Sequence, residues 1–282
     1  MTPNTDSIWF TEMCKEGGSA FSLQIREKLH EEKTAFQHIE IYSTTHFGNL
    51  MVIDGFVMLT ALDNFLYHEM MSHPALFTHP DPKRVVIIGG GDCGTLREVL
   101  RHPGVRQVTQ IDIDERVTRL SETYFPELCE SNDDPRAELL FIDGIKWMQQ
   151  AEAASIDVII VDSTDPIGPG EVLFSEEFYR ACHDALRPDG LIVQQSESPL
   201  LHRALLKRIR HDMVSAGFAG TRTLQFPQPV YPGGWWSATM AMSLSAWPEP
   251  RYAEMEKIAG MRYFNRAIFD ASLALPAFMT EE

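Results

Sequence analysis

The chain has 282 residues and a composition typical of a folded globular protein, with 44% hydrophobic and 23% charged residues. Its formal net charge of −16 argues against a nucleic-acid partner and is compatible with a cationic substrate. The alternative explanation is that the acidic residues only keep the protein soluble. No apolar run is long enough to cross a bilayer, and the first residues lack a secretory signal, so we expect a cytoplasmic protein without membrane contact. The four cysteines form no CxxC pair, so we expect neither a disulfide framework nor a zinc site.

Residues 1–66 are predicted to form a small antiparallel β domain. The segment QHIEIYS alternates apolar and polar side chains, which is the pattern of a half-buried strand. In NLMVIDGFVMLT, Asp54 and Gly55 separate two apolar runs, a strong signal for a β-hairpin. Residues 62–77 then predict a helix that links this region to the rest of the chain.

From Arg84 onward, strand patterns alternate with helix patterns, and residues 67–282 are predicted to form a second, larger domain. Such alternation implies an α/β fold with a mostly parallel sheet that is covered by helices on both faces. The five strand patterns are RVVIIGG, QVTQIDID, AELLFIDG, IDVIIVD and GLIVQQS.

Aspartates follow the carboxyl ends of four of these strands. They are Asp92, Asp112, Asp143, Asp162 and Asp165. Ligands bind at this edge in open α/β sheets, so we expect the five side chains to gather at one site. Each aspartate taken singly is explained equally well as a helix cap or turn residue. Five carboxylates together would repel one another, and a cationic ligand would relieve that repulsion.

The loop GGGDCG matches the GxGxxG pattern through Gly89, Gly91 and Gly94, between a strand and a helix. This context predicts a nucleoside ligand whose ribose hydroxyls bond to Asp112 at the end of the next strand. Asp92 lies within the loop, which has no lysine or arginine, so a pyrophosphate would be unfavourable there. A sulfonium compound such as S-adenosylmethionine fits better. Its decarboxylated form, which ends in an ammonium group, suits Asp92 best.

Two other patterns suggest different functions and are given less weight. HEMMSH resembles the zinc-protease motif HExxH, but His68 and His73 are five residues apart and cannot share a helix face. Trp235 and Trp236 could form an aromatic platform, although tryptophans in such a strand-like segment more often belong to the core or an interface.

With these residues in view, the chain resembles the polyamine aminopropyltransferases, most closely bacterial spermidine synthases. The resemblance covers nearly the whole length, and the glycine-rich loop followed by the DSTDPIGP element is highly specific. It includes FQHIEIY, NFLYHEMMSHPALF, VVIIGGGDCGTLREVLRHPGV, VDSTDPIGPGEVLFSEEFY, PVYPGGWWS and RYFNRAIFDASLALP.

The resemblance implies a methyltransferase-like, Rossmann-type α/β domain behind the small N-terminal β domain, assembled as a homodimer or homotetramer. It implies transfer of an aminopropyl group from decarboxylated S-adenosylmethionine, a co-substrate, to putrescine or another diamine. The products would be spermidine and methylthioadenosine, and neither a metal nor a separate cofactor is implied.

The resemblance also implies roles for single residues. Asp162 would be the catalytic base, assisted by Tyr67, and Asp92 would bind the aminopropyl ammonium group. Asp112 would bind ribose and Asp143 the adenine amino group. Further donor contacts are implied for Gln37, Gly89, Gly91 and Gly144, and acceptor contacts for His68, Asp165, Gln195 and Tyr231.

Some positions depart from the family pattern. Met58 stands where the family often has glutamine, and residues 61–64 read ALDN where it commonly has ERDE. These changes lie near the donor side chain and the mouth of the cleft, so the acceptor stays open. A methyltransferase that uses ordinary S-adenosylmethionine is the alternative enzyme, and a non-enzymatic nucleoside or polyamine binding module is a weaker one.

Overall fold

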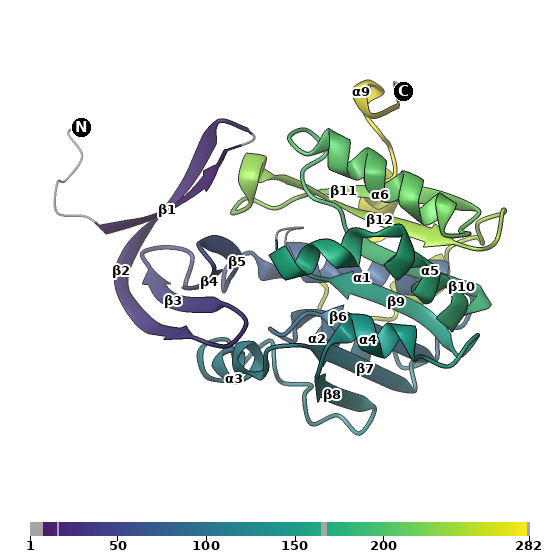
Figure 1. The fold of residues 1–282 in the computed structure, drawn as a ribbon, viewed down its shortest axis with the longest axis horizontal. Coiled ribbons are helices and arrows are strands. Elements are labelled where there is room, and N and C mark those ends of the chain that lie inside the picture. Colours follow the sequence, from purple (N-terminus) through teal and green to yellow (C-terminus); the bar gives the residue numbers. More distant parts are fainter. Residues whose placement is uncertain (1–7, 16, 165–167, 281–282) are drawn as a thin grey trace.

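The computed structural model describes residues 8–15, 17–164 and 168–280 (Figure 1). Two β-sheets follow one another along the chain, and helices surround the second sheet. Within the described ranges, no helix is both long and apolar enough to cross a membrane. The predicted site residue Asp165 falls outside the described residues.

The N-terminal sheet is antiparallel, with its strands in chain order. The strands are β1 (Ile8–Cys14), β2 (Ser19–Lys33), β3 (His38–Thr44), β4 (Asn49–Ile53) and β5 (Phe56–Thr60). The hairpin predicted at Asp54 and Gly55 is confirmed, because both residues have positive φ, 52° and 88°. β2 is longer than the short strands expected, with 15 residues. Its first half pairs with β1 and its second half with β3.

The second sheet has the order β11-β12-β10-β9-β6-β7-β8. Its strands are β6 (Arg84–Gly89), β7 (Gln107–Asp112), β8 (Ala137–Phe141), β9 (Ile156–Asp162), β10 (Leu186–Gln195), β11 (Gly220–Pro227) and β12 (Trp235–Met242). The five strands from β10 to β8 are parallel, whereas β12 runs antiparallel to both of its neighbours. The predicted, mostly parallel α/β sheet is therefore confirmed.

Helices cover both faces of this sheet, as the strand patterns require. One apolar cluster includes Met70 of α1, Leu96 of α2 and Phe269 of α8, and the other includes Phe178 of α5 and Ile209 of α6. The larger helices are α1 (Asn64–Thr78), α2 (Gly94–Leu100), α3 (Glu115–Tyr124), α5 (Glu176–Ala185), α6 (Arg203–Ser215) and α8 (Arg266–Ser272). The short ones are α4 (Gly144–Gln149), η1 (Gly168–Phe174), η2 (Pro232–Gly234), α7 (Tyr252–Met255) and α9 (Ala277–Thr280).

Helix α3 joins the two sheets. Its Val117 and Leu120 pack against Ile39 and Ile41 of β3 in a third apolar cluster. Figure 1 shows α3 beside the curved end of the N-terminal sheet. This packing brings the N-terminal sheet against the carboxyl end of β7, where the predicted site begins.

Candidate active site

A cavity of about 360 Å³ lies at the carboxyl ends of the parallel strands, under the N-terminal sheet. The predicted residues that line it are Gln37, Tyr67, Gly89, Gly91, Asp92, Asp112, Asp143, Gly144, Asp162 and Tyr231. Gln195 lines a smaller adjoining cavity of about 40 Å³, together with Tyr67 and Tyr231. His68 lines neither cavity. Apart from Asp165 and His68, the structure thus brings the predicted residues together around one cleft.

The charge of the larger cavity is strongly one-sided. Among the described residues that line it, five are aspartates and none is lysine, arginine or histidine. The aspartates are Asp54, Asp92, Asp112, Asp143 and Asp162. Asp54 was predicted only as a turn residue. Since like charges held together in a partly desolvated space repel, this cavity favours a cationic ligand.

Asp162 ends the fully buried strand β9, and both of its carboxylate oxygens accept hydrogen bonds. The Tyr67 hydroxyl donates to Oδ1 at 2.8 Å, and the Thr95 hydroxyl donates to Oδ2 at 2.6 Å. Burial, followed by the nearby Asp92 carboxylate, raises the pKa of Asp162. A carboxylate with a raised pKa and fixed orientation is suited to accept a proton from a bound ligand.

Asp92 and His68 form an ion pair at the rim of the loop after β6. The His68 Nε2 atom lies 3.2 Å from Asp92 Oδ1, and the Gly94 amide donates to the same oxygen at 2.6 Å. Burial opposes charge on both groups, but their mutual attraction outweighs it, so the pKa of Asp92 is lowered and that of His68 raised. His68 is 1% exposed and lies behind Asp92. The predicted contact between His68 and the acceptor stays a prediction. In this structure His68 acts on the cavity through Asp92, whose ionised form it stabilises.

Asp112 lines the larger cavity and is half-buried. Its Oδ1 accepts the Asp114 amide at 2.8 Å. Burial is the largest cause of a pKa raised to about 6. Asp112 therefore changes charge within the range of pH at which enzymes are commonly assayed, and it accepts hydrogen bonds best when it is ionised.

Asp143 caps helix α4, so the alternative explanation for single aspartates is correct here. Its Oδ1 accepts the amides of Ile145 at 3.0 Å and Lys146 at 3.2 Å. Its Oδ2 lies 3.1 Å from the Lys146 ammonium group. Because the residue also lines the cavity, the cap does not prevent contact with a ligand.

Two glycines of the GxGxxG loop are explained by contacts inside the protein. A side chain at Gly89, which has φ 83°, would overlap the backbone carbonyl oxygen of Asp162. A Cβ at Gly91 would lie 2.7 Å from the Asp112 Oδ2 atom. The loop therefore needs glycine to bring Asp112 and Asp162 close to it, in addition to any approach by a ligand.

Three residues that the sequence analysis missed complete the site. Thr95 bonds to Asp162, and no sequence pattern marked it. Asp114 caps α3 and accepts hydrogen bonds from Thr34 at 2.7 Å and from the Gln37 amide at 3.0 Å. A helix-capping signal, Asp before Glu115, would have identified it as a cap only. Glu12 lines the smaller cavity and accepts the Val57 amide at 2.6 Å.

The HEMMSH segment and the tryptophan pair, the two patterns given less weight, both have structural explanations. His73 lies away from His68 and contacts His102 at 2.9 Å and Glu98 at 3.2 Å, so the two histidines do not form a metal pair. Trp236 is 3% exposed, with its ring centroid 4.7 Å from that of Tyr231, and it lines the smaller cavity. It therefore belongs both to the core and to the edge of the site.

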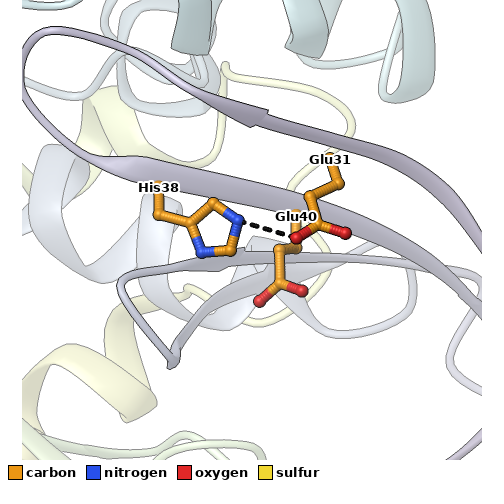
Figure 2. Close-up of side chains that lie close together, drawn as sticks. All are labelled: Glu31, His38 and Glu40. Atoms are coloured by element: carbon orange, nitrogen blue, oxygen red, sulfur yellow. Dashed lines mark hydrogen bonds and ion pairs between the residues drawn. The ribbon is translucent and has the colours of Figure 1, made fainter.

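A possible metal cluster lies apart from the cleft, on β2 and β3. One ligand atom from each of Glu31, His38 and Glu40 lies within 4.8 Å of the others (Figure 2). The Lys28 ammonium group contacts two of these side chains, 2.7 Å from Glu31 Oε2 and 2.6 Å from Glu40 Oε1. Because the chain itself supplies the cation, we assign no metal to this cluster.

Comparison with known proteins places this site in a family. The model of the spermine/spermidine synthase domain matches residues 64–247, and that of the spermidine synthase tetramerisation domain matches residues 8–61. A polyamine aminopropyltransferase of Methylococcus capsulatus is 62% identical over 270 residues, 96% of this chain and 95% of the relative. That of Nitrosococcus oceani is 61% identical over 277 residues, 97% of each chain.

Solved structures agree with the sequence relatives. A spermidine synthase in complex with the transition-state analogue AdoDATO has a TM-score of 0.92 at 34% identity, over 97% of this chain and 94% of that one. The spermidine synthase of Thermotoga maritima has a TM-score of 0.90 at 33% identity, over 97% and 93%. The chain therefore belongs to the spermine/spermidine synthase family and is an enzyme of the polyamine aminopropyltransferase class.

Proposed function

We propose that the protein transfers the aminopropyl group of decarboxylated S-adenosylmethionine to putrescine, giving spermidine and methylthioadenosine. The observation that carries this proposal is the cavity lined by five aspartates and, among its described residues, no basic side chain. Both substrates are cations, since the donor carries a sulfonium and an ammonium group and putrescine carries two ammonium groups. Ordinary S-adenosylmethionine would bring a carboxylate towards Asp92, which is less favourable.

The donor is proposed to lie along the carboxyl ends of β6, β7 and β8. Asp92 would hold the ammonium end of the aminopropyl group, and Asp112 would accept bonds from the ribose hydroxyls. Asp143 and Gly144 would meet the adenine ring. The apolar side chains of Ile88, Ile111, Ile113 and Ile145 line the same cavity and suit the flat base.

Asp162 is proposed to remove a proton from the attacking amine. A primary amine has a pKa near ~10.4, so about one molecule in a thousand is neutral at pH ~7.4. Only the neutral amine has a lone pair that can attack carbon. The proton passes to Asp162, the amine nitrogen bonds to the methylene next to sulfur, and the carbon–sulfur bond breaks. Its electrons return to sulfur, so methylthioadenosine leaves as a neutral thioether and needs no acid.

The acceptor is proposed to occupy the smaller cavity. Tyr67, Gln195 and Tyr231 would surround its nitrogens there, and Asp165, which lies outside the described residues, would anchor the attacking amine. Putrescine is the acceptor that the family implies, and a panel of diaminopropane, putrescine, cadaverine and spermidine with product mass spectrometry would test it. A preference for any other amine would correct the acceptor without changing the reaction.

The assembly is proposed to be a homodimer or homotetramer, formed through the N-terminal sheet. β1 exposes Ile8, Trp9 and Met13, at 65%, 55% and 63% of their surfaces. Such apolar exposure on one strand is typical of an interaction surface. The match of residues 8–61 to a tetramerisation domain supports the same assignment. A cytoplasmic location agrees with the free cysteines, Cys14, Cys93, Cys129 and Cys182.

Incubation with decarboxylated S-adenosylmethionine and putrescine tests the reaction directly. We expect methylthioadenosine and spermidine in equal amounts, measured by chromatography and mass spectrometry. Binding of both substrates without formation of product would favour the non-enzymatic binding module. Tighter calorimetric binding of ordinary S-adenosylmethionine than of the decarboxylated form would favour a methyltransferase.

A further inference from the structure

Thr95 is bound to the carboxylate of Asp162 although it lies outside the cleft. It is the second residue of α2, its side chain is 0% exposed and it lines neither cavity. Its hydroxyl lies 2.6 Å from Asp162 Oδ2, while Tyr67 of α1 holds Oδ1 at 2.8 Å. Among the residues that the structure describes, each oxygen thus has one donor, from a different helix. Rotation of the carboxylate would break both bonds, so the two helices fix its orientation.

The fold alone does not require a hydroxyl at this position. A threonine inside a helix commonly bonds to a carbonyl one turn earlier, and the carbonyl of Gly91 already accepts the Thr118 hydroxyl at 2.8 Å. Valine has nearly the same shape as threonine and would fill the same buried space. What valine lacks is the donor to Asp162.

Several charged groups act on Asp162, and most of them disfavour its ionised form. Burial is the largest cause that raises its pKa, and the carboxylate of Asp92 in the glycine-rich loop, which repels it, acts in the same direction. The carboxylates of Asp162 and Asp112 also repel each other. His68 of α1 and the hydroxyls of Thr95 and Tyr67 act in the opposite direction. The Tyr67 hydroxyl stays neutral, because burial raises its pKa well above the usual value.

We propose that Thr95 is a positioning residue for the reaction, which holds Asp162 ionised and aimed at the attacking amine. The inference rests on the proposed role of Asp162 as the base. A protonated Asp162 cannot accept the proton of the amine, so each donor that stabilises the ionised form extends activity to lower pH. Thr95 acts only through Asp162, so ligand binding does not depend on its hydroxyl.

The test compares Thr95→Val and Thr95→Ser with the wild type. For Thr95→Val we expect the acidic limb of the pH profile of kcat/KM to move up by about one to two pH units, the size of one hydrogen bond to a charged group. On that limb, activity falls about tenfold per unit. Thr95→Ser keeps the hydroxyl and should restore the wild-type limb. Methylthioadenosine affinity should stay within about twofold of the wild type in both variants.

Thr78→Val is the matched control. Thr78 is also a buried threonine, and it donates to the Pro74 carbonyl oxygen at 2.7 Å, on α1 and away from both cavities. It should leave the pH profile unchanged. If Thr95→Val has the wild-type limb, or if Thr95→Ser does not restore it, the proposal is wrong.

A second measurement separates this proposal from the proposed reaction. Carbon-13 NMR of labelled aspartate carboxyls, with the Asp162 signal identified by its loss in Asp162→Asn, gives the titration of Asp162 without any turnover. We expect a higher pKa in Thr95→Val, or in Thr95→Ala if the valine variant does not fold. An unchanged titration overturns the inference. A shifted titration in a protein that makes no spermidine would overturn the reaction and keep the hydrogen bond.

Discussion

The hydroxyl of Tyr67 lies 2.8 Å from Oδ1 of Asp162, and this contact connects the first helix to the end of β9. Asp162 is 9% exposed and Tyr67 is 7% exposed, so the bond is largely shielded from water. Asp162 lines the larger cavity, and Tyr67 lines both cavities. A neutral phenol that donates to a carboxylate fixes its direction without removing its negative charge. The geometry therefore leaves Asp162 able to take a proton.

Asp162→Asn should reduce kcat by at least about 100-fold, because general-base contributions are usually about 10²–10⁴-fold. Methylthioadenosine affinity, measured by calorimetry, should change little. Asp157→Asn is a control on the same strand. Asp157 accepts the Lys83 and Arg84 amides far from the cleft, so its loss should lower stability and leave kcat near that of the wild type. Activity of Asp162→Asn within about threefold of the wild type would contradict the assignment of the base.

His68→Gln should weaken binding of the donor more than binding of the product. The imidazolium holds Asp92 ionised, and only the donor carries the ammonium group that Asp92 is proposed to bind. We expect KM for the donor to rise about tenfold, the effect of about 1.4 kcal/mol, while methylthioadenosine affinity stays within about twofold. His73→Gln, a buried histidine on the same helix, is the control. Equal loss of both ligands would show that His68 only supports the local fold.

Methylthioadenosine affinity should depend on the ionisation of Asp112. Its pKa is raised to about 6, so the protonated form predominates in the free enzyme below that pH. If the ribose hydroxyls bind the ionised form, Kd should be constant above pH ~7 and should rise about tenfold per unit below pH ~6. Calorimetry from pH 5 to 8 measures this. Asp112→Asn has no carboxylate that can be protonated, so it should bind methylthioadenosine more weakly and with a Kd that does not depend on pH. If Kd of that variant still rises about tenfold per pH unit, another group is responsible for the titration.

Strand and helix types could be predicted for the second domain because its apolar patterns are regular. β9 is buried at every position, and the residues that follow such a strand lie at the sheet edge by geometry alone. The extent of β2 could not be predicted, because its two halves pair with different strands and its apolar side chains, such as Leu23 and Leu29, belong to different clusters. The chain also bulges there, between Ile25 and Glu27 and between Lys28 and His30.

The charged residues of the site could be predicted from their positions at strand ends. Residues that reach the site only through contacts between distant elements could not. Asp92, Asp112 and Asp162 follow strand ends and were found from that position. Thr95 is one threonine among many, and only the fold, which places the first turn of α2 beside the end of β9, brings it to Asp162. For the same reason, the sequence could not show that His68 contacts Asp92 and does not line the cleft itself.

Asp114→Ala should loosen the junction between the two sheets. It removes the side-chain cap of α3 and the acceptor for Thr34 and Gln37. Loss of a cap costs about 1 kcal/mol, and each lost hydrogen bond to a charged group costs more, so we expect a loss of at least about 2 kcal/mol. For a chain of this size the melting temperature should fall by at least roughly 4 °C, measured by circular dichroism. Glu115→Ala, at the exposed next residue, should change it by less than about 2 °C.

Gly89→Ala and Gly55→Ala form a pair that isolates one steric contact. Both glycines have similar φ, 83° and 88°, so both alanines bear a similar backbone strain. Apart from its chain neighbours, no heavy atom of the described residues lies within 4 Å of a Cβ built at Gly55, whereas one at Gly89 would overlap the carbonyl oxygen of Asp162. Gly55→Ala should therefore cost about 1–2 kcal/mol in the free energy of unfolding, the range for backbone strain alone. Gly89→Ala should cost clearly more and should also displace Asp162, so kcat falls together with stability. Denaturant unfolding measures the first effect and the transferase assay the second. Equal destabilisation by the two substitutions would contradict this prediction, because it would mean that β6 and β9 can move apart at the site. Tyr67 and Thr95 alone would then have to fix the position of the Asp162 carboxylate.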